Sequence, residues 1–233
     1  MKIVFRPKEY NKPDRAMAVL AYKVKNGVKR KEKIDLSSYY ASLMGISEGY
    51  QKQAKLNEFI KSSKGLAETL VAMGNGNLAG IIYSILIKLN VKNPDALEQL
   101  ATNALAIAKR FNDPVHIMAR AENLVRIYEK REFGSHKHID TLYTEKRALV
   151  DICKDYDKSK KRFRSISSRM KPIENYERML AGVKIKIAEI IMHKEPKVAI
   201  EELKGAKSLI EKQGDGAHIV KINNLITKLE ARC

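Results

Sequence analysis

Apolar residues recur at intervals of three and four along most of the chain, the spacing that places side chains on one face of an α-helix. The pattern runs from Ser37 to the end of the 233-residue sequence, with short interruptions rich in Gly, Asn, Asp and Pro. Its clearest run steps by 3, 4, 3, 4 and 3 residues from Ile173 to Ile190. Such a narrow seam is typical of a helix that packs against another helix. The pattern therefore predicts an all-α fold.

Start signals separate the expected helices. Four of the six prolines stand just before a helical pattern, where the fixed φ of proline suits the first turn. Asn93 and Asp113 each precede a proline and carry side chains that cap helices. We expect helices over residues 51–59, 66–73, 78–89, 97–111, 117–128, 139–156, 173–190, 196–210 and 219–229.

The first 36 residues have a different pattern. Ile3–Phe5 is apolar enough for a short strand, and Met17–Val24 alternates weakly between apolar and polar residues. Asn26-Gly27 follows, and this dipeptide between extended runs is a strong hairpin signal because both residues tolerate positive φ. Val28–Leu36 would then be the return strand. We interpret this segment as a small basic β-hairpin, and an extended arm without regular structure is the alternative.

A sequence pattern recurs three times in the helical part of the chain. Ala104, Ala148 and Ala206 each precede an Asp by nine residues, with a basic residue three positions before that Asp. The alanines are 44 and 58 residues apart, and self-similarity on this scale is typical of stacked helical repeats. Helices joined by short turns pack antiparallel and bury their apolar stripes against one another.

Three stretches carry a family resemblance. Ala104-Leu-Ala-Ile-Ala-Lys-Arg-Phe-Asn-Asp-Pro114 resembles the second helix of a tetratricopeptide-like repeat, and Arg147-Ala-Leu-Val-Asp-Ile-Cys-Lys-Asp-Tyr-Asp157 echoes it. Ala121-Glu-Asn-Leu-Val-Arg-Ile-Tyr128 is similar to the first helix of the next repeat. The resemblance covers about residues 95–157. It implies a right-handed stack of antiparallel helix pairs, an α-solenoid with a concave interaction surface, and it implies no activity.

The expected organisation has two parts. Residues 1–36 form a basic N-terminal extension or hairpin, and residues 37–233 form a helical-repeat domain. A basic connection at residues 158–171 interrupts that domain.

Positive charge is concentrated in two segments. The chain has a formal net charge of +18. Residues 1–36 hold 11 basic and 4 acidic side chains, and residues 135–171 hold 11 basic and 5 acidic ones. Such a field attracts nucleic acid, anionic lipid or an acidic protein surface. General solubility is the alternative reading of the charge.

The two basic segments supply the candidate contacts to a polyanion. Lysine and arginine neutralise phosphates, and an aromatic ring stacks on an unpaired base. The candidates are Lys158, Lys160, Lys161, Arg162, Phe163, Arg164, Arg169 and Lys171 in the connection, and Lys29, Arg30, Lys31 and Lys33 near the N-terminus.

The helical repeat suggests a second set of contacts. Arg120, Arg126 and Lys130 are candidates to line a groove that faces an acidic partner. We therefore expect a non-catalytic scaffold that binds an anionic partner, an acidic protein or peptide above all. The alternative is an RNA- or DNA-binding protein that uses residues 1–36 and 158–171.

No arrangement of residues favours catalysis. His136-Lys-His138 with Asp140 lacks the further ligands of a metal site, and we read it as a solvated loop. Gly74–Gly80 follows a helical pattern rather than the strand that a phosphate-binding loop needs, which favours a turn between helices. Glu201-Glu202 is read as part of a solvated helix face. We expect no enzyme activity, cofactor or metal.

The remaining expectations concern location. Only two cysteines are present, Cys153 and Cys233, which favours a reducing, cytoplasmic compartment over a disulfide framework. The most apolar stretch, Leu78–Leu89, is too short to span a bilayer. The first 22 residues are charged throughout and lack the apolar core of a secretion signal.

Overall fold

The computed structural model describes residues 2–5, 12–89, 93–157 and 172–231. Within them the chain forms ten α-helices and two strands of two residues each, so the predicted all-α class is confirmed. The chain divides into two compact units, Met1–Phe111 and Asn112–Cys233. Each unit has its own apolar core.

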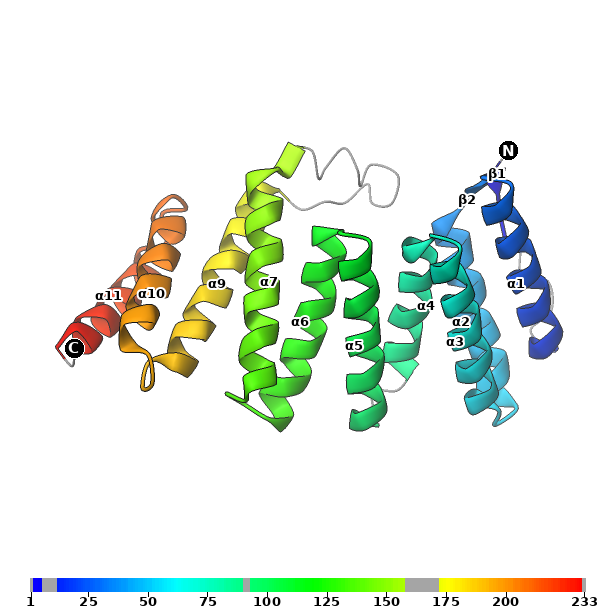
Figure 1. The fold of residues 1–233 in the computed structure, drawn as a ribbon, viewed down its shortest axis with the longest axis horizontal. Helices are drawn as coiled ribbons and strands as arrows, with labels where there is room; N and C mark the ends of the chain where they lie inside the picture. Colours follow the sequence, from blue (N-terminus) through cyan, green and yellow to red (C-terminus); the bar gives the residue numbers. More distant parts are fainter. Residues whose placement is uncertain (1, 6–11, 90–92, 158–171, 232–233) are drawn as a thin grey trace. The chain divides into compact units, whose positions relative to one another are not determined.

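The first unit contains five helices and both strands (Figure 1). Consecutive helices pack against each other, and α1 also contacts α3 while α2 contacts α4. Its core includes the buried rings of Tyr39, Tyr50 and Phe59. The elements are β1 (Lys2–Ile3), α1 (Pro13–Lys29), β2 (Lys33–Ile34), α2 (Leu36–Lys52), α3 (Leu56–Ala72), α4 (Gly76–Leu89) and α5 (Pro94–Arg110).

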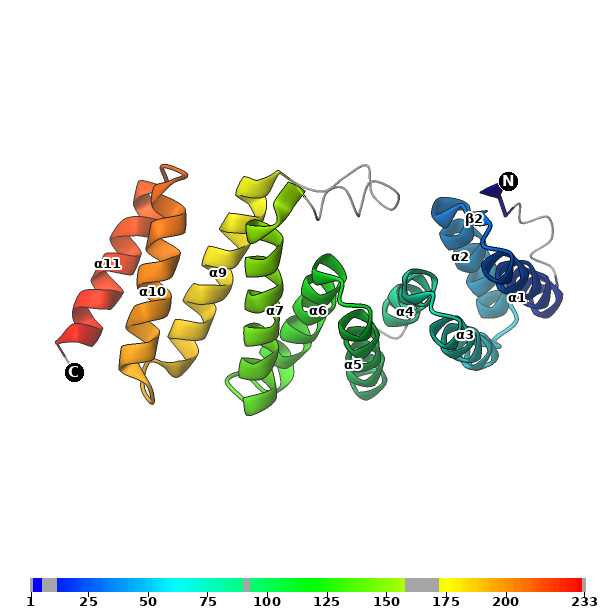
Figure 2. The ribbon, with the colours of Figure 1, turned by 45° about the horizontal axis from the view of Figure 1, so that its top comes forward.

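The second unit contains five helices, each of which packs on the next one along the chain (Figures 1 and 2). Small buried residues at helix contacts, including Ala121, Ala148 and Ala206, let the backbones approach closely. The elements are α6 (Pro114–Arg131), α7 (His136–Lys154), α9 (Ile173–Ile191), α10 (Pro196–Glu211) and α11 (Gly216–Glu230).

The capping residues act as the sequence predicts. The side chain of Asn93 accepts a hydrogen bond from the backbone N–H of Ala96 at 3.1 Å, and Asp113 accepts one from His116 at 3.1 Å. Each satisfies one of the backbone donors left unpaired at a helix start. One expected helix is wrong, because residues 51–59 are broken between α2 and α3. Ala54 has a φ of 56° there, outside the helical region.

The predicted N-terminal β-hairpin is also wrong. Residues 13–29 form helix α1, which begins at Pro13 and buries Met17, Leu20, Val24 and Gly27 on one face. These positions follow helical spacing, so Asn26-Gly27 lies in the last turn of the helix and not in a hairpin turn. The chain reverses at Lys31, whose φ is 57°.

The two short strands form a parallel pair. Lys2 pairs with Lys33 and Ile3 with Ile34. The backbone N–H of Asp35 also donates to the carbonyl of Ile3 at 3.0 Å. Parallel strands need a long crossover between them. Helix α1 forms this crossover, in the region where the hairpin interpretation placed a strand at Met17–Val24 and a tight turn at Asn26-Gly27.

Candidate partner-binding surface

Helix α1 presents a face that no other helix of the first unit covers. Its buried side chains point toward α2 and α3, and the opposite side is solvent-exposed. At 3.6 residues per turn, residues 15, 19, 22, 23, 26, 29 and 30 fall within about a third of the helix circumference, and the exposed Asp14 and Ala18 lie next to them. We call this face, together with Val4 beside it, the α1 surface; its residues are Val4, Arg15, Val19, Tyr22, Lys23, Asn26, Lys29 and Arg30.

The α1 surface carries unusual apolar exposure. Tyr22 is 69% exposed, Val4 49% and Val19 47%. Few large apolar side chains elsewhere in the described residues are this open to solvent. Isolated apolar residues on a surface need no explanation, but a group rimmed by charges is typical of a contact site.

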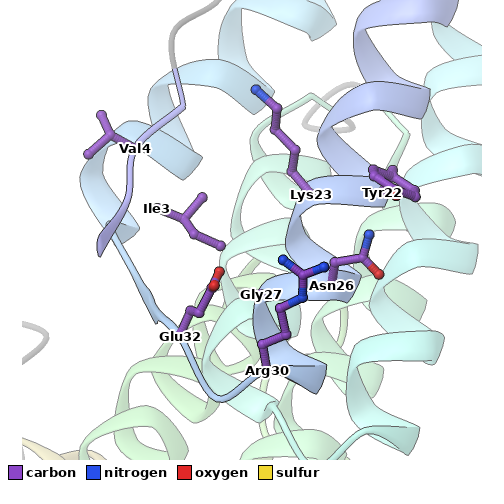
Figure 3. A pocket seen from close by; sticks show the side chains of 8 residues that line it. All are labelled: Ile3, Val4, Tyr22, Lys23, Asn26, Gly27, Arg30 and Glu32. Carbon is purple, nitrogen blue, oxygen red and sulfur yellow. The ribbon is translucent and has the colours of Figure 1, made fainter. Parts of the chain in front are cut away.

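A pocket of about 450 Å³ lies between α1 and the first strand (Figure 3). Helix α1 supplies Tyr22, Lys23, Asn26 and Arg30 to its wall, and the side chain of Ile3 points toward the helix. The full lining consists of Ile3, Val4, Tyr22, Lys23, Asn26, Gly27, Arg30 and Glu32. The pocket is therefore apolar on the strand side and basic on the helix side.

The charge around the pocket is strongly positive. Residues 12–35 carry eight basic and three acidic side chains. Neither Lys23 nor Arg30 forms an ion pair with another described residue. Glu32 is the acidic member of the lining. These cations are thus available to a carboxylate or phosphate that comes from outside.

The structure places the predicted N-terminal cations near this pocket. Arg30 lines it directly. Lys29 is exposed in the last turn of α1, Lys31 lies in the following turn, and Lys33 is exposed in β2. Sequence reasoning missed Val4, Tyr22 and Lys23. The spacing of Met17, Leu20 and Val24 predicts that residues 13–29 are helical. A helix with these residues buried exposes its opposite face, on which residues 15, 19, 22, 23, 26 and 30 lie.

The predicted basic connection cannot be placed. Lys158, Lys160, Lys161, Arg162, Phe163, Arg164, Arg169 and Lys171 lie outside the described residues.

The predicted groove residues all lie on α6, in different settings. The Nη2 atom of Arg126 lies 2.6 Å from Oε1 of Glu122, and both belong to one exposed pair on the helix. Lys130 is exposed one turn later. Arg120 is half-buried, and burial lowers the pKa of its guanidinium.

A buried polar seam on α7 faces α6 and α9, and sequence reasoning did not find it. His138, Thr141 and Glu145 are 1%, 8% and 4% exposed. Burial raises the pKa of the Glu145 carboxyl to about 7, and the nearby Glu122 acts in the same direction. Above the seam, Nζ of Lys186 in α9 lies 2.6 Å from Oε1 of Glu129 in α6.

A second buried carboxylate, that of Glu202 in α10, is paired with two lysines. Its carboxylate accepts hydrogen bonds from Lys146 of α7 and, at 2.9 Å, from Lys184 of α9. A Cβ atom on Gly205 would lie 2.8 Å from Nζ of Lys184, so the glycine leaves room for this cation. The reading of Glu201-Glu202 as a solvated face is wrong for Glu202, because only Glu201 is exposed.

The His136–His138 segment is helical and not a loop. Nδ1 of His136 lies 2.8 Å from a carboxylate oxygen of Asp140, one turn further along α7. Nδ1 of the buried His138 accepts a hydrogen bond from the backbone N–H of Gly134 at 3.1 Å. In the described part of the chain, no three His, Cys, Asp or Glu side chains are arranged to hold a metal ion.

The two units therefore use their cations differently. The half-buried Lys146 and Lys184 of the second unit are matched by the carboxylate of Glu202, whereas Lys23 and Arg30 at the α1 pocket form no ion pair with a described residue. None of the described helices combines the length and apolarity needed to cross a lipid bilayer. No protein-family model matches the sequence, and no curated protein matches it at a significant level.

Proposed function

We propose that the protein is a non-catalytic helical-repeat scaffold that binds an acidic protein or peptide through the α1 surface. The observation that carries the proposal is the pocket lined by Lys23 and Arg30, with the exposed side chains of Val4 and Tyr22 on its two sides (Figure 3). An apolar anchor with unmatched cations around it fits a partner that has an apolar side chain flanked by carboxylates.

A stacked-helix architecture supports the scaffold part of the proposal. Within each unit, each helix packs on its neighbour along the chain. A tetratricopeptide-like solenoid, in which each helix pair stabilises the next, would pack its helices in this way. Arrays of this kind function mainly by presenting extended surfaces to partners.

A protein partner explains the pocket better than a nucleic acid does. The apolar side chains of Ile3 and Val4 in the pocket lining cannot stack on bases as aromatic rings do. Glu32 in the lining would repel a phosphate, whereas a peptide can place an apolar or amide group beside it. An acidic polypeptide satisfies both the apolar and the cationic side of the surface.

RNA or DNA binding is the second candidate function. Tyr22 is 69% exposed and has Lys23 and Arg30 nearby, an arrangement in which a base would stack on the ring while the cations contact phosphates. The contacts proposed from the sequence in residues 1–36 and 158–171 would extend the interface.

Binding to defined probes separates the two functions. Fluorescence anisotropy would be measured with a labelled peptide rich in Glu and Leu, a single-stranded RNA and a DNA duplex, all at one salt concentration. Two variants remove the surface, Tyr22→Ser and the double variant Lys23→Ala with Arg30→Ala. The matched control, Lys52→Ala with Lys61→Ala, removes the same charge from exposed positions on α2 and α3.

The proposal expects affinity for the peptide to fall about tenfold in both surface variants and to stay unchanged in the control. Tighter binding of RNA or DNA than of the peptide, with the same dependence on Tyr22, would support the second function instead. Equal losses in the control and in the surface variants would overturn both, because they would reflect net charge alone.

A further inference from the structure

The exposed face of α1 has the geometry of a helix-packing seam. Arg15, Val19, Tyr22, Asn26 and Lys29 are separated by 4, 3, 4 and 3 residues. This alternation keeps one line of side chains facing a neighbouring helix along its whole length. The opposite, buried face of α1 uses the same spacing at Met17, Leu20 and Val24. Helix α1 is thus suited to pack against helices on two sides, and the first unit fills one of them.

The seam has an apolar centre with basic residues on both sides. Val19 and Tyr22 form an apolar centre, and the pocket with Ile3 and Val4 opens beside it. Arg15 precedes this centre, and Lys23, Lys29 and Arg30 flank or follow it. From Arg15 to Arg30 the face spans about 22 Å at 1.5 Å per residue. This length corresponds to about four turns of a partner helix.

Charge decides which helix fits. A second copy of the α1 surface would bring cations against cations, at a cost that opposes pairing. An acidic helix reverses the sign and places carboxylates opposite Arg15, Lys23 and Arg30. Its own apolar stripe would cover Val19 and Tyr22, so the contact needs an amphipathic helix with acidic flanks.

We infer that the acidic partner docks as an amphipathic α-helix laid along α1, with one large apolar side chain in the pocket between α1 and Val4. The inference rests on the proposed function and specifies the form in which the partner is recognised. The partner helix continues the side-by-side packing of the first unit by one more helix. This is helix recognition through anchors spaced by three and four residues.

Three labelled peptides of identical composition test the inference on the full chain. Each consists of 18 residues of Glu, Ala, Gln and Leu together with a single Pro. In the first peptide the leucines follow 3–4 spacing and the Pro stands at the N-terminus, where a helix tolerates it. In the second the order is scrambled so that no apolar stripe forms. The third has the first sequence with the Pro moved to the centre, where it breaks a helix at a cost of about 3 kcal/mol.

The first peptide is expected to bind at least tenfold more tightly than the other two, and Tyr22→Ser should abolish that preference. Circular dichroism should show a gain of helix when the first peptide binds. If all three peptides bind equally and still depend on Lys23 and Arg30, the partner is not read as a helix and the inference fails while the proposed function stands. If none depends on Lys23 and Arg30, the proposed function fails with it.

Discussion

The side chain of Ile3 in β1 occupies the space in which a Cβ atom on Gly27 of α1 would lie. The tip of the Ile3 side chain can lie against α1 only because Gly27 has no side chain. This contact closes the inner wall of the α1 pocket, since both residues line it.

Gly27→Ala should therefore displace the Ile3 side chain and destabilise the protein. A glycine-to-alanine change inside a helix normally stabilises it by about 0.5–1 kcal/mol, but the clash with Ile3 should outweigh this and give a net loss of about 1–3 kcal/mol. Urea unfolding measures the change. Gly65→Ala in α3 is the control, because nothing lies within 4 Å of its Cβ position, and it should stabilise the protein. Stabilisation in both variants would contradict the contact.

The same glycine explains why the N-terminal fold was mispredicted. Asn26-Gly27 indicates a hairpin where the backbone of these residues must adopt a positive φ. Here the close approach of Ile3 requires the glycine, and the residue with positive φ is Lys31. The dipeptide alone does not show whether its glycine serves a positive φ or a close contact with another segment. The contact depends on Ile3, which lies more than twenty residues away in the sequence. Helices such as α4 and α9 were predictable because their apolar spacing extends over several turns.

Glu145 should make the second unit less stable as the pH rises. Its folded-state pKa is about 7, against an ordinary value of 4.5, so the folded protein retains a proton that the unfolded chain releases. The stabilisation is complete below pH 4.5 and is lost as the pH rises through 7. The groups that surround this carboxyl are Glu122, Arg126 and Glu129 of α6 and Lys186 of α9.

Glu145→Gln should remove that loss. Between pH 4.5 and pH 8 the stability of the variant should fall by about 3 kcal/mol less than that of the unmodified protein. Urea unfolding at several pH values measures how the free energy of unfolding changes with pH in the variant and in the unmodified protein. Glu201→Gln, at an exposed site on α10, is the control and should leave the slope unchanged. A slope that Glu145→Gln does not alter would show that this carboxyl ionises freely.

Glu202 should respond to pH in the opposite sense. Burial raises its pKa, but the hydrogen bonds from Lys146 and Lys184 outweigh burial and bring the pKa below its ordinary value. Its contribution is therefore present above the unfolded pKa and is lost as the pH falls through the folded pKa. Glu202→Gln leaves two half-buried ammonium groups without a counter-charge and should cost about 3 kcal/mol at pH 7.

An exposed pair provides the comparison for Glu202. Nζ of Lys204 lies 3.4 Å from Oε1 of Glu230, and both side chains are more than half exposed. Glu230→Gln should change the unfolding free energy by less than about 1 kcal/mol. Similar losses in Glu202→Gln and Glu230→Gln would mean that burial adds nothing to the three-residue cluster.

The sequence does not reveal which carboxylates are buried. Glu201 and Glu202 are adjacent and chemically identical, yet one is solvated and the other is held between two lysines from α7 and α9. The partners are 56 and 18 residues away from Glu202. Such matching depends on how three helices pack together. Helix caps, in contrast, are local, which is why Asn93 and Asp113 were assigned correctly.

The cap at Asp113 supports a final prediction on the start of α6. One carboxylate oxygen accepts the backbone N–H of His116 at 3.1 Å, and the other lies 2.6 Å from Nδ1 of its ring. Asp113→Ala removes both contacts and should cost about 1–2 kcal/mol, whereas Asp113→Asn keeps an acceptor for the backbone and should cost less than half as much. Equal losses in thermal unfolding would assign the stabilisation to the charge on Asp113 near the helix N-terminus and the His116 ring, and not to the backbone cap.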